Sequence, residues 1–305
     1  MGRIRRALPN FARGFTMGAV DVVPGVSGGT MALILGIYER LIASIHAASA
    51  AAGFTLRLDR GRAAERFREV DWWLVIPLLV GILTAIITLA RVIEHFLETE
   101  PEALSALFLG LVAASIVVAW RLIRRPHLEY AFVALAVAVA TFALLGLRSS
   151  AIEDPSTLAL FGAGALAICA MILPGVSGSF LLLMIGLYDA VIEAVNDREI
   201  GRLAAFALGA AVGLALFSSL LDWLLRRYHD LVLSALIGLM IGSLRVLWPW
   251  PEGTDSAEIA APPSGAWFVP ALLALAGVAA VLLLAWFGGR KAPAPPAGQP
   301  ATSGD

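Results

Sequence analysis

The sequence predicts an all-α polytopic membrane protein with two inverted-topology repeats, each made of a re-entrant helical hairpin and three transmembrane helices. Hydrophobic residues make up 59% of the 305 residues and charged residues only 15%, which is typical of membrane proteins. One short motif occurs twice, and six apolar runs are long enough to cross a bilayer. We expect one membrane domain over residues 1–305, with repeat 1 at about 10–147, repeat 2 at about 157–287 and a disordered Pro- and Ala-rich tail at 288–305.

The repeated motif lies near the start of each half. Residues 21–30 read Asp-Val-Val-Pro-Gly-Val-Ser-Gly-Gly-Thr, and residues 171–180 read Met-Ile-Leu-Pro-Gly-Val-Ser-Gly-Ser-Phe. The match continues without a gap to Gly36 and Tyr38, which recur in the same register as Gly186 and Tyr188. Composition alone does not produce such an alignment, so the two halves are related repeats.

Each copy of the motif predicts a break within a hydrophobic helix, because proline lacks an N–H group and glycine tolerates positive φ. The serine that follows is placed to cap a new helix, whose first N–H groups have no partner within the helix and attract anions, phosphate above all. Within a bilayer, duplicated broken helices are the usual location of a transporter's binding site. We expect the phosphate-binding groups to be Gly25, Ser27, Gly28, Gly29, Thr30, Gly175, Ser177, Gly178 and Ser179. The alternative, that the motif merely kinks a packed helix, is disfavoured by the near-identical second copy.

The six apolar runs predict the transmembrane helices. They lie near Trp72–Phe96, Ala103–Leu122, Tyr130–Leu147, Leu203–Leu225, Leu231–Trp248 and Trp267–Phe287. The arms that flank the first motif, Phe11–Val22 and Gly28–Tyr38, are each half a membrane long at about 1.5 Å per residue, which favours a re-entrant hairpin. The arm Thr157–Leu173, before the second motif, is longer and nearly crosses the membrane.

Arginine placement predicts the side of the membrane on which each connection lies. If both motifs form hairpins that enter and leave on one side, most arginines of the connections share one face: Arg57, Arg60, Arg62, Arg66, Arg68, Arg121, Arg124, Arg125, Arg226 and Arg227. By the positive-inside rule this face is cytoplasmic, and so are both chain termini. An odd number of crossings then separates the halves, so the repeats are inverted. Ten spans, with two full crossings at each motif, would have the same parity and remain an alternative.

Three acidic residues are candidates for coupling transport to an ion. Asp21 is the only acid deep in a broken-helix arm, and a carboxylate inside a membrane is expensive and usually functional. The other interpretation is that it caps N–H groups of the break. Glu39 and Asp189 occupy matching positions at the far end of each hairpin. Their recurrence favours a shared role, although acids at helix ends near water are common.

Two arginines are candidates for contact with an anion. Arg245 directly precedes a tryptophan-rich boundary, and we expect it to extend to the outer interface, with an anionic substrate as the alternative partner. Arg91 belongs with Glu94 and Glu98 to a group at helical spacing, which favours interfacial ion pairs over a relay.

Composition and spacing exclude several classes of site. Cys169 is the only cysteine, so no intrachain disulfide or cysteine-based metal cluster can form. The four histidines have no spacing typical of a metal site, and none is expected in the setting of arginine and aspartate that a lipid phosphatase requires. We therefore predict a protein that is not an enzyme, that uses no metal or cofactor and that has no nucleic-acid partner.

The paired motif, together with Gly36 and Tyr38, resembles the signature of a bacterial and archaeal membrane family that was formerly described as a domain of unknown function and is associated with polyprenyl-phosphate transport. The resemblance runs from about Asn10 to Phe287. It implies ion-coupled flipping of undecaprenyl phosphate, a carrier lipid of cell-envelope precursors, from the outer to the cytoplasmic leaflet of the bacterial cytoplasmic membrane. The partners would be the bilayer and a polyprenyl-phosphate lipid. A channel or secondary transporter for a small inorganic anion is the alternative, because helix termini bind chloride or phosphate equally well.

Overall fold

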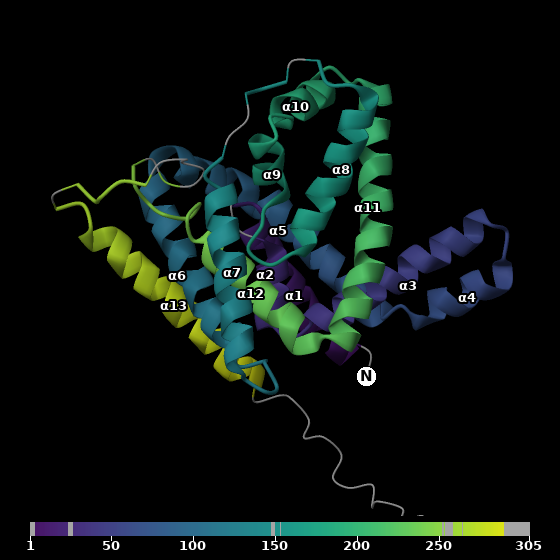
Figure 1. Cartoon of the computed structure of the whole chain (residues 1–305), viewed down its shortest axis with the longest axis horizontal. Coiled ribbons are helices and arrows are strands. Elements are labelled where there is room, and N and C mark those ends of the chain that lie inside the picture. The colour runs from purple at the N-terminus through teal and green to yellow at the C-terminus, as the bar shows by residue number, and fades with distance from the viewer. Residues whose placement is uncertain are drawn as a thin grey trace, which may run out of the picture.

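Helices account for all the regular secondary structure of the described residues (Figure 1). The computed structural model describes residues 4–23, 27–147, 150–152, 154–251, 253, 259–263 and 265–289. Gly25 and residues 290–305 of the expected tail lie outside these ranges. The helices are α1 (Ile4–Asp21), α2 (Gly28–Ile34), α3 (Tyr38–Leu56), α4 (Arg60–Glu69), α5 (Trp72–Thr99), α6 (Pro101–Trp120), α7 (Leu128–Leu144), α8 (Thr157–Ile172), α9 (Gly178–Met184), α10 (Tyr188–Asn196), α11 (Ile200–Arg227), α12 (His229–Ser243) and α13 (Phe268–Gly289).

Among the described residues, four helices are long and apolar enough to cross a membrane, namely α5, α6, α11 and α13. They correspond to four of the six predicted spans. The other two, α7 and α12, are apolar but shorter, with 17 and 15 residues. The outer side chains of α5 are apolar, as shown by Leu83 and Ile87, which are 57% and 79% exposed, and such a surface suits lipid. The chain is thus a multi-pass membrane protein.

Each half contains two helix interruptions at equivalent positions. The Pro-Gly motif separates α1 from α2 and α8 from α9. A second turn separates α2 from α3 and α9 from α10, and its glycines, Gly36 and Gly186, have φ values of 66° and 72°. Glycine is favoured there because a side chain rarely tolerates the left-handed conformation. The pair α9–α10 bends by 112° at this turn.

Both halves pack their first long helix against the arm that precedes the motif. α1 lies against α5, and α8 lies against α11. A Cβ atom added at Gly14 or Gly81 would collide with the backbone of the other helix of the first pair, and the same holds for Gly164 and Gly209 in the second pair. Small residues let helix backbones approach closely in a membrane, where packing provides the driving force for association. Glycine therefore sets the helix separation at equivalent places in the two halves.

The last two helices of each half pack against the other half. α6 lies against α13, and α7 lies against α12. A Cβ added at Gly110 would meet the Ala274 backbone, and one added at Gly238 would meet the Ala134 carbonyl oxygen at 2.5 Å. The repeats also share one hydrophobic core, in which Met31 of the first half and Met240 of the second are both fully buried.

The two hairpins approach each other from opposite ends of the molecule. In Figure 1, α8 and α9 extend from the end at which α10 lies, whereas α1 extends from the end that carries the N label. The α6–α7 connection, the α11–α12 connection and the end of α13 lie toward the same end as the start of α1. The α3–α4 hairpin, for which the second half has no counterpart of α4, projects to one side.

The substitution Gly209→Ala tests the close packing of α8 on α11. The added Cβ would meet the Phe161 carbonyl group, so we expect a loss of stability of about 1–3 kcal/mol, as at other overpacked sites. Gly201→Ala is the matched control on α11, because nothing lies within 4 Å of its Cβ. It should leave stability unchanged or raise it by up to about 1 kcal/mol. Thermal unfolding of the purified proteins measures both, and equal melting temperatures would contradict the packing argument.

Candidate functional site

The first helix break is closed by hydrogen bonds within its own segment. Ser27 caps α2, because its Oγ accepts a hydrogen bond from the Gly29 N–H at 3.1 Å and its carbonyl accepts one from the Thr30 N–H at 2.9 Å. The carboxylate of Asp21, the last residue of α1, accepts a hydrogen bond from the Gly28 N–H. Ser27 and Thr30 are 2% and 0% exposed. The first three N–H groups of α2 therefore all have acceptors within the protein.

The second helix break lacks this closure. Met171 stands where the first copy has Asp21, and no side chain caps α9. The hydroxyl groups of Ser177 and Ser179 bond to each other at 2.9 Å instead. Among the described residues, the N–H groups of Gly178 and Ser179 have no acceptor. Such unpaired groups at a helix N-terminus carry partial positive charge.

The two breaks touch each other. The Ser27 hydroxyl donates to the Met171 carbonyl at 3.1 Å, and the Thr30 hydroxyl accepts a hydrogen bond from the Gly175 N–H at 3.0 Å. The Tyr38 hydroxyl donates to the carbonyl of the residue after Met171 at 3.2 Å. The accepting carbonyls lie at the end of α8, where a helix has no internal donors left. Each break thus supplies hydrogen-bond partners to the other.

The predicted phosphate-binding residues of both copies are therefore close together, but their N–H groups are not equally available. Those of Gly28, Gly29, Thr30 and Gly175 donate to protein oxygen atoms. Those at the start of α9 do not, and the two serine hydroxyls lie beside them. In this arrangement, the donors that an anion could use belong to the second copy.

The three candidate acids lie in three different settings. Asp21 is exposed and accepts a hydrogen bond from the Gly28 N–H. This is the capping arrangement, one of the two interpretations that the sequence allowed. Glu39 pairs with His229, with 2.8 Å between Oε1 and Nε2. Asp189, the repeat counterpart of Glu39, is exposed and forms no ion pair within the described part of the chain. Glu39 and Asp189 therefore differ in their ion pairing, and a shared role for them stays a prediction.

His229 is a functional candidate that sequence reasoning missed. Its other ring nitrogen, Nδ1, lies 2.8 Å from the carboxylate of Asp230, which also accepts hydrogen bonds from the N–H groups of Arg124 and Arg125 at 3.1 Å each. The prediction that no histidine lies in a setting of aspartate and arginine is therefore wrong. No signal in the sequence could have found the cluster, because Glu39 and Arg124 come from the first half of the chain and His229 from the second.

The two candidate arginines have different surroundings. Arg245 packs over the ring of Phe142, with its guanidinium carbon 4.7 Å from the ring centroid, and an aromatic face stabilises such a charge. Arg91 is exposed on α5. In the described residues it forms no ion pair with Glu94 or Glu98, so the predicted interfacial ion pairs are not formed.

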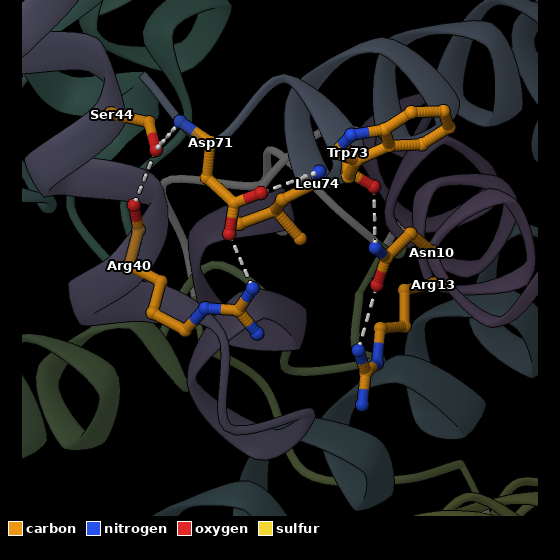
Figure 2. Close-up of polar contacts among 7 residues, drawn as sticks. All are labelled: Asn10, Arg13, Arg40, Ser44, Asp71, Trp73 and Leu74. Carbon is orange, nitrogen blue, oxygen red and sulfur yellow. Dashed lines mark hydrogen bonds and ion pairs between the residues drawn. The ribbon is translucent and has the colours of Figure 1, made fainter. Parts of the chain in front are cut away.

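A polar network at the base of the first hairpin joins α1, α3 and α5 (Figure 2). Asp71 caps α5 by accepting a hydrogen bond from the Leu74 N–H at 3.1 Å, and it pairs with Arg40 of α3 at 2.5 Å. Asn10 of α1 donates to the Trp73 carbonyl at 2.7 Å. The network holds α1 and α3 against the beginning of α5.

Comparison with known proteins places these features in a family. The family described as undecaprenyl phosphate translocase-like matches residues 17–261, a range that contains both breaks. A Vibrio cholerae protein named polyprenyl-phosphate transporter is 40% identical over 252 residues, which cover 82% of this chain and 80% of that protein. A Staphylococcus aureus protein of the same name is 28% identical over 258 residues, which cover 79% of this chain and 86% of that protein. No solved structure matches. The chain belongs to the undecaprenyl phosphate translocase-like family.

Proposed function

We propose that the protein translocates a polyprenyl phosphate across the cytoplasmic membrane. The family supports this, and so does one observation: two helix breaks from opposite ends of the molecule meet, and one of them has N–H groups without a protein acceptor. A lipid monophosphate needs an anion site that can open to either leaflet. Inverted repeats with cytoplasmic termini would provide such a site by rocking about this contact.

The phosphate would bind first at the second break. Its donors would be the N–H groups of Gly178 and Ser179 and the hydroxyls of Ser177 and Ser179. Oriented N–H groups at a helix N-terminus attract an anion. At the first break the Asp21 carboxylate already accepts a hydrogen bond from the Gly28 N–H. A carboxylate oxygen therefore takes the position that a phosphate oxygen would need.

This competition offers a way to couple transport to a proton. The Asp21 carboxylate and a lipid phosphate would both require the Gly28 N–H, and two negative charges at one site repel each other. Proton uptake by Asp21 would remove one of the charges and release the N–H group. Transfer of the phosphate from the second break to the first would then be accompanied by protonation of Asp21.

A leaflet-exchange assay with the purified protein in vesicles tests the proposed function. A polyprenyl phosphate supplied in the outer leaflet should appear in the inner leaflet, whereas a polyprenol that lacks the phosphate should not. Chloride or inorganic phosphate flux without lipid exchange would identify the inorganic-anion transporter instead. Lipid exchange no faster than in protein-free vesicles would refute the proposal.

The substitution Gly178→Leu should abolish lipid exchange in a protein that still inserts. A Cβ there would lie 2.8 Å from the Ala167 carbonyl oxygen and 2.7 Å from Cγ of Met171, so the start of α9 must shift and its donors must lose their alignment. Loss of charge-assisted hydrogen bonds predicts at least about a tenfold lower exchange rate. Gly162→Leu on α8 is the control, because nothing lies within 4 Å of a Cβ at that position. Normal exchange by inserted Gly178→Leu protein would eliminate the assigned site.

The substitution Asp21→Asn distinguishes the capping of the Gly28 N–H by Asp21 from the proposed coupling of transport to a proton. The amide oxygen can still accept from the Gly28 N–H, but the side chain no longer changes its charge with pH. We expect lipid exchange to persist and to lose the pH dependence of the wild-type protein. Asp197→Asn, at the exposed end of α10, is the matched control and should keep the wild-type pH profile. A wild-type pH profile in Asp21→Asn would show that Asp21 does not couple transport to protons.

A further inference from the structure

A cavity of about 350 Å³ lies at the base of the first hairpin, at the C-terminal end of α2. Residues of both halves line it. Leu33, Leu122 and Leu233 provide an apolar floor, whereas the side chains of Arg40 and Arg124 belong to its polar part. The cavity thus combines a surface suited to hydrocarbon with a surface suited to an anion.

Two arginine side chains and one carboxylate line the polar part of the cavity. Within the described part of the chain, the Arg124 guanidinium has no partner, and the Arg40 side chain is 55% exposed although it pairs with Asp71. The acid that lines the cavity, Glu39, is engaged by His229. Both ring nitrogens of His229 lie 2.8 Å from carboxylate oxygens.

We propose that this cavity binds a phosphomonoester and is the place where the lipid headgroup leaves the protein on the cytoplasmic side. The inference rests on the proposed function. Arg40 and Arg124 would hold the phosphate oxygens, since a guanidinium matches them with two parallel N–H donors. The leucine floor would hold the first isoprene units. A prenyl phosphomonoester uses both surfaces, whereas inorganic phosphate uses only the arginines.

The cavity is linked to the helix breaks by its own lining. Tyr38 lines it and donates to the Ile172 carbonyl at the second break. The Glu39–His229 contact joins the first hairpin to α12 across the cavity. A movement of one break against the other would therefore change the shape of the cavity. The site binds and does not cleave its ligand, because both nitrogens of His229 face carboxylates and neither is available as a nucleophile.

Equilibrium binding of farnesyl phosphate to the full-length protein in detergent tests the site. Arg124→Gln should weaken binding about tenfold through loss of a charge-assisted contact, and Arg40→Gln should act similarly. Arg121→Gln removes the same charge from the same α6–α7 connection without lining the cavity, so its affinity should equal that of the wild type. Wild-type affinity in Arg124→Gln, or release of inorganic phosphate from farnesyl phosphate, would overturn the proposal.

Protection of a cysteine in the cavity from a thiol reagent shows whether the bound phosphate belongs to a lipid or is inorganic phosphate. With Cys169→Ser as background, Leu122→Cys is labelled with a thiol reagent from the cytoplasmic side of the vesicles. Farnesyl phosphate should slow labelling, and inorganic phosphate at the same concentration should not. Equal protection by inorganic phosphate would overturn the lipid assignment, and no protection by either would eliminate the site.

Leaflet exchange by the same proteins separates this proposal from the proposed function. Combined Arg40→Gln and Arg124→Gln substitutions should slow exchange at least about tenfold, while Arg121→Gln should not. Unchanged exchange by the doubly substituted protein would refute the exit site and leave translocation intact. A wild-type protein that binds farnesyl phosphate at the cavity but exchanges no lipid would instead refute translocation and retain the cavity.

Discussion

A helix that is broken inside a membrane must find partners for the N–H and carbonyl groups that the break releases, because hydrocarbon supplies none. The two Pro-Gly motifs meet this constraint by bonding to each other. Ser27 and Tyr38 donate to carbonyls at the end of α8, and Thr30 accepts from Gly175. Since these donors and acceptors come from different halves, the bonds form only where the two breaks meet. The glycine contacts and the helices that pack across the halves hold the two breaks at this distance.

Within this shared arrangement, side-chain differences between the two copies give the two breaks different chemistry. Asp21 closes the first by holding the Gly28 N–H, whereas Met171 leaves the start of α9 without a capping acceptor. Ser179, which stands where the first copy has Gly29, also bonds to the Ser177 hydroxyl. Under the proposed function, this difference would let the two breaks hold a phosphate unequally, and a carrier must hold its ligand less tightly at one step in order to release it.

Local features of the sequence were sufficient to predict an all-helical membrane protein interrupted at Pro-Gly. Proline and glycine act on their own backbone, and hydropathy is read over one segment at a time. α7 and α12 are shorter than predicted, because apolar residues continue into the turns after Leu144 and Ser243. The contact of His229 with Glu39 and the bonds between the breaks could not be predicted, since each joins residues far apart in the chain. The Asp21 bond to Gly28 is local, and the sequence allowed it as one of two interpretations.

The packing of α6 against α13 affects how the protein is made. α6 leaves the ribosome long before α13 is synthesised, so the face of α6 that carries Gly110 first lies in the bilayer without its permanent neighbour. Lipid or an insertion factor must cover that face in the meantime. The tertiary structure of the first half is completed only when the final span enters the membrane, and a polypeptide that ends before α13 would expose the uncovered face to cellular quality control.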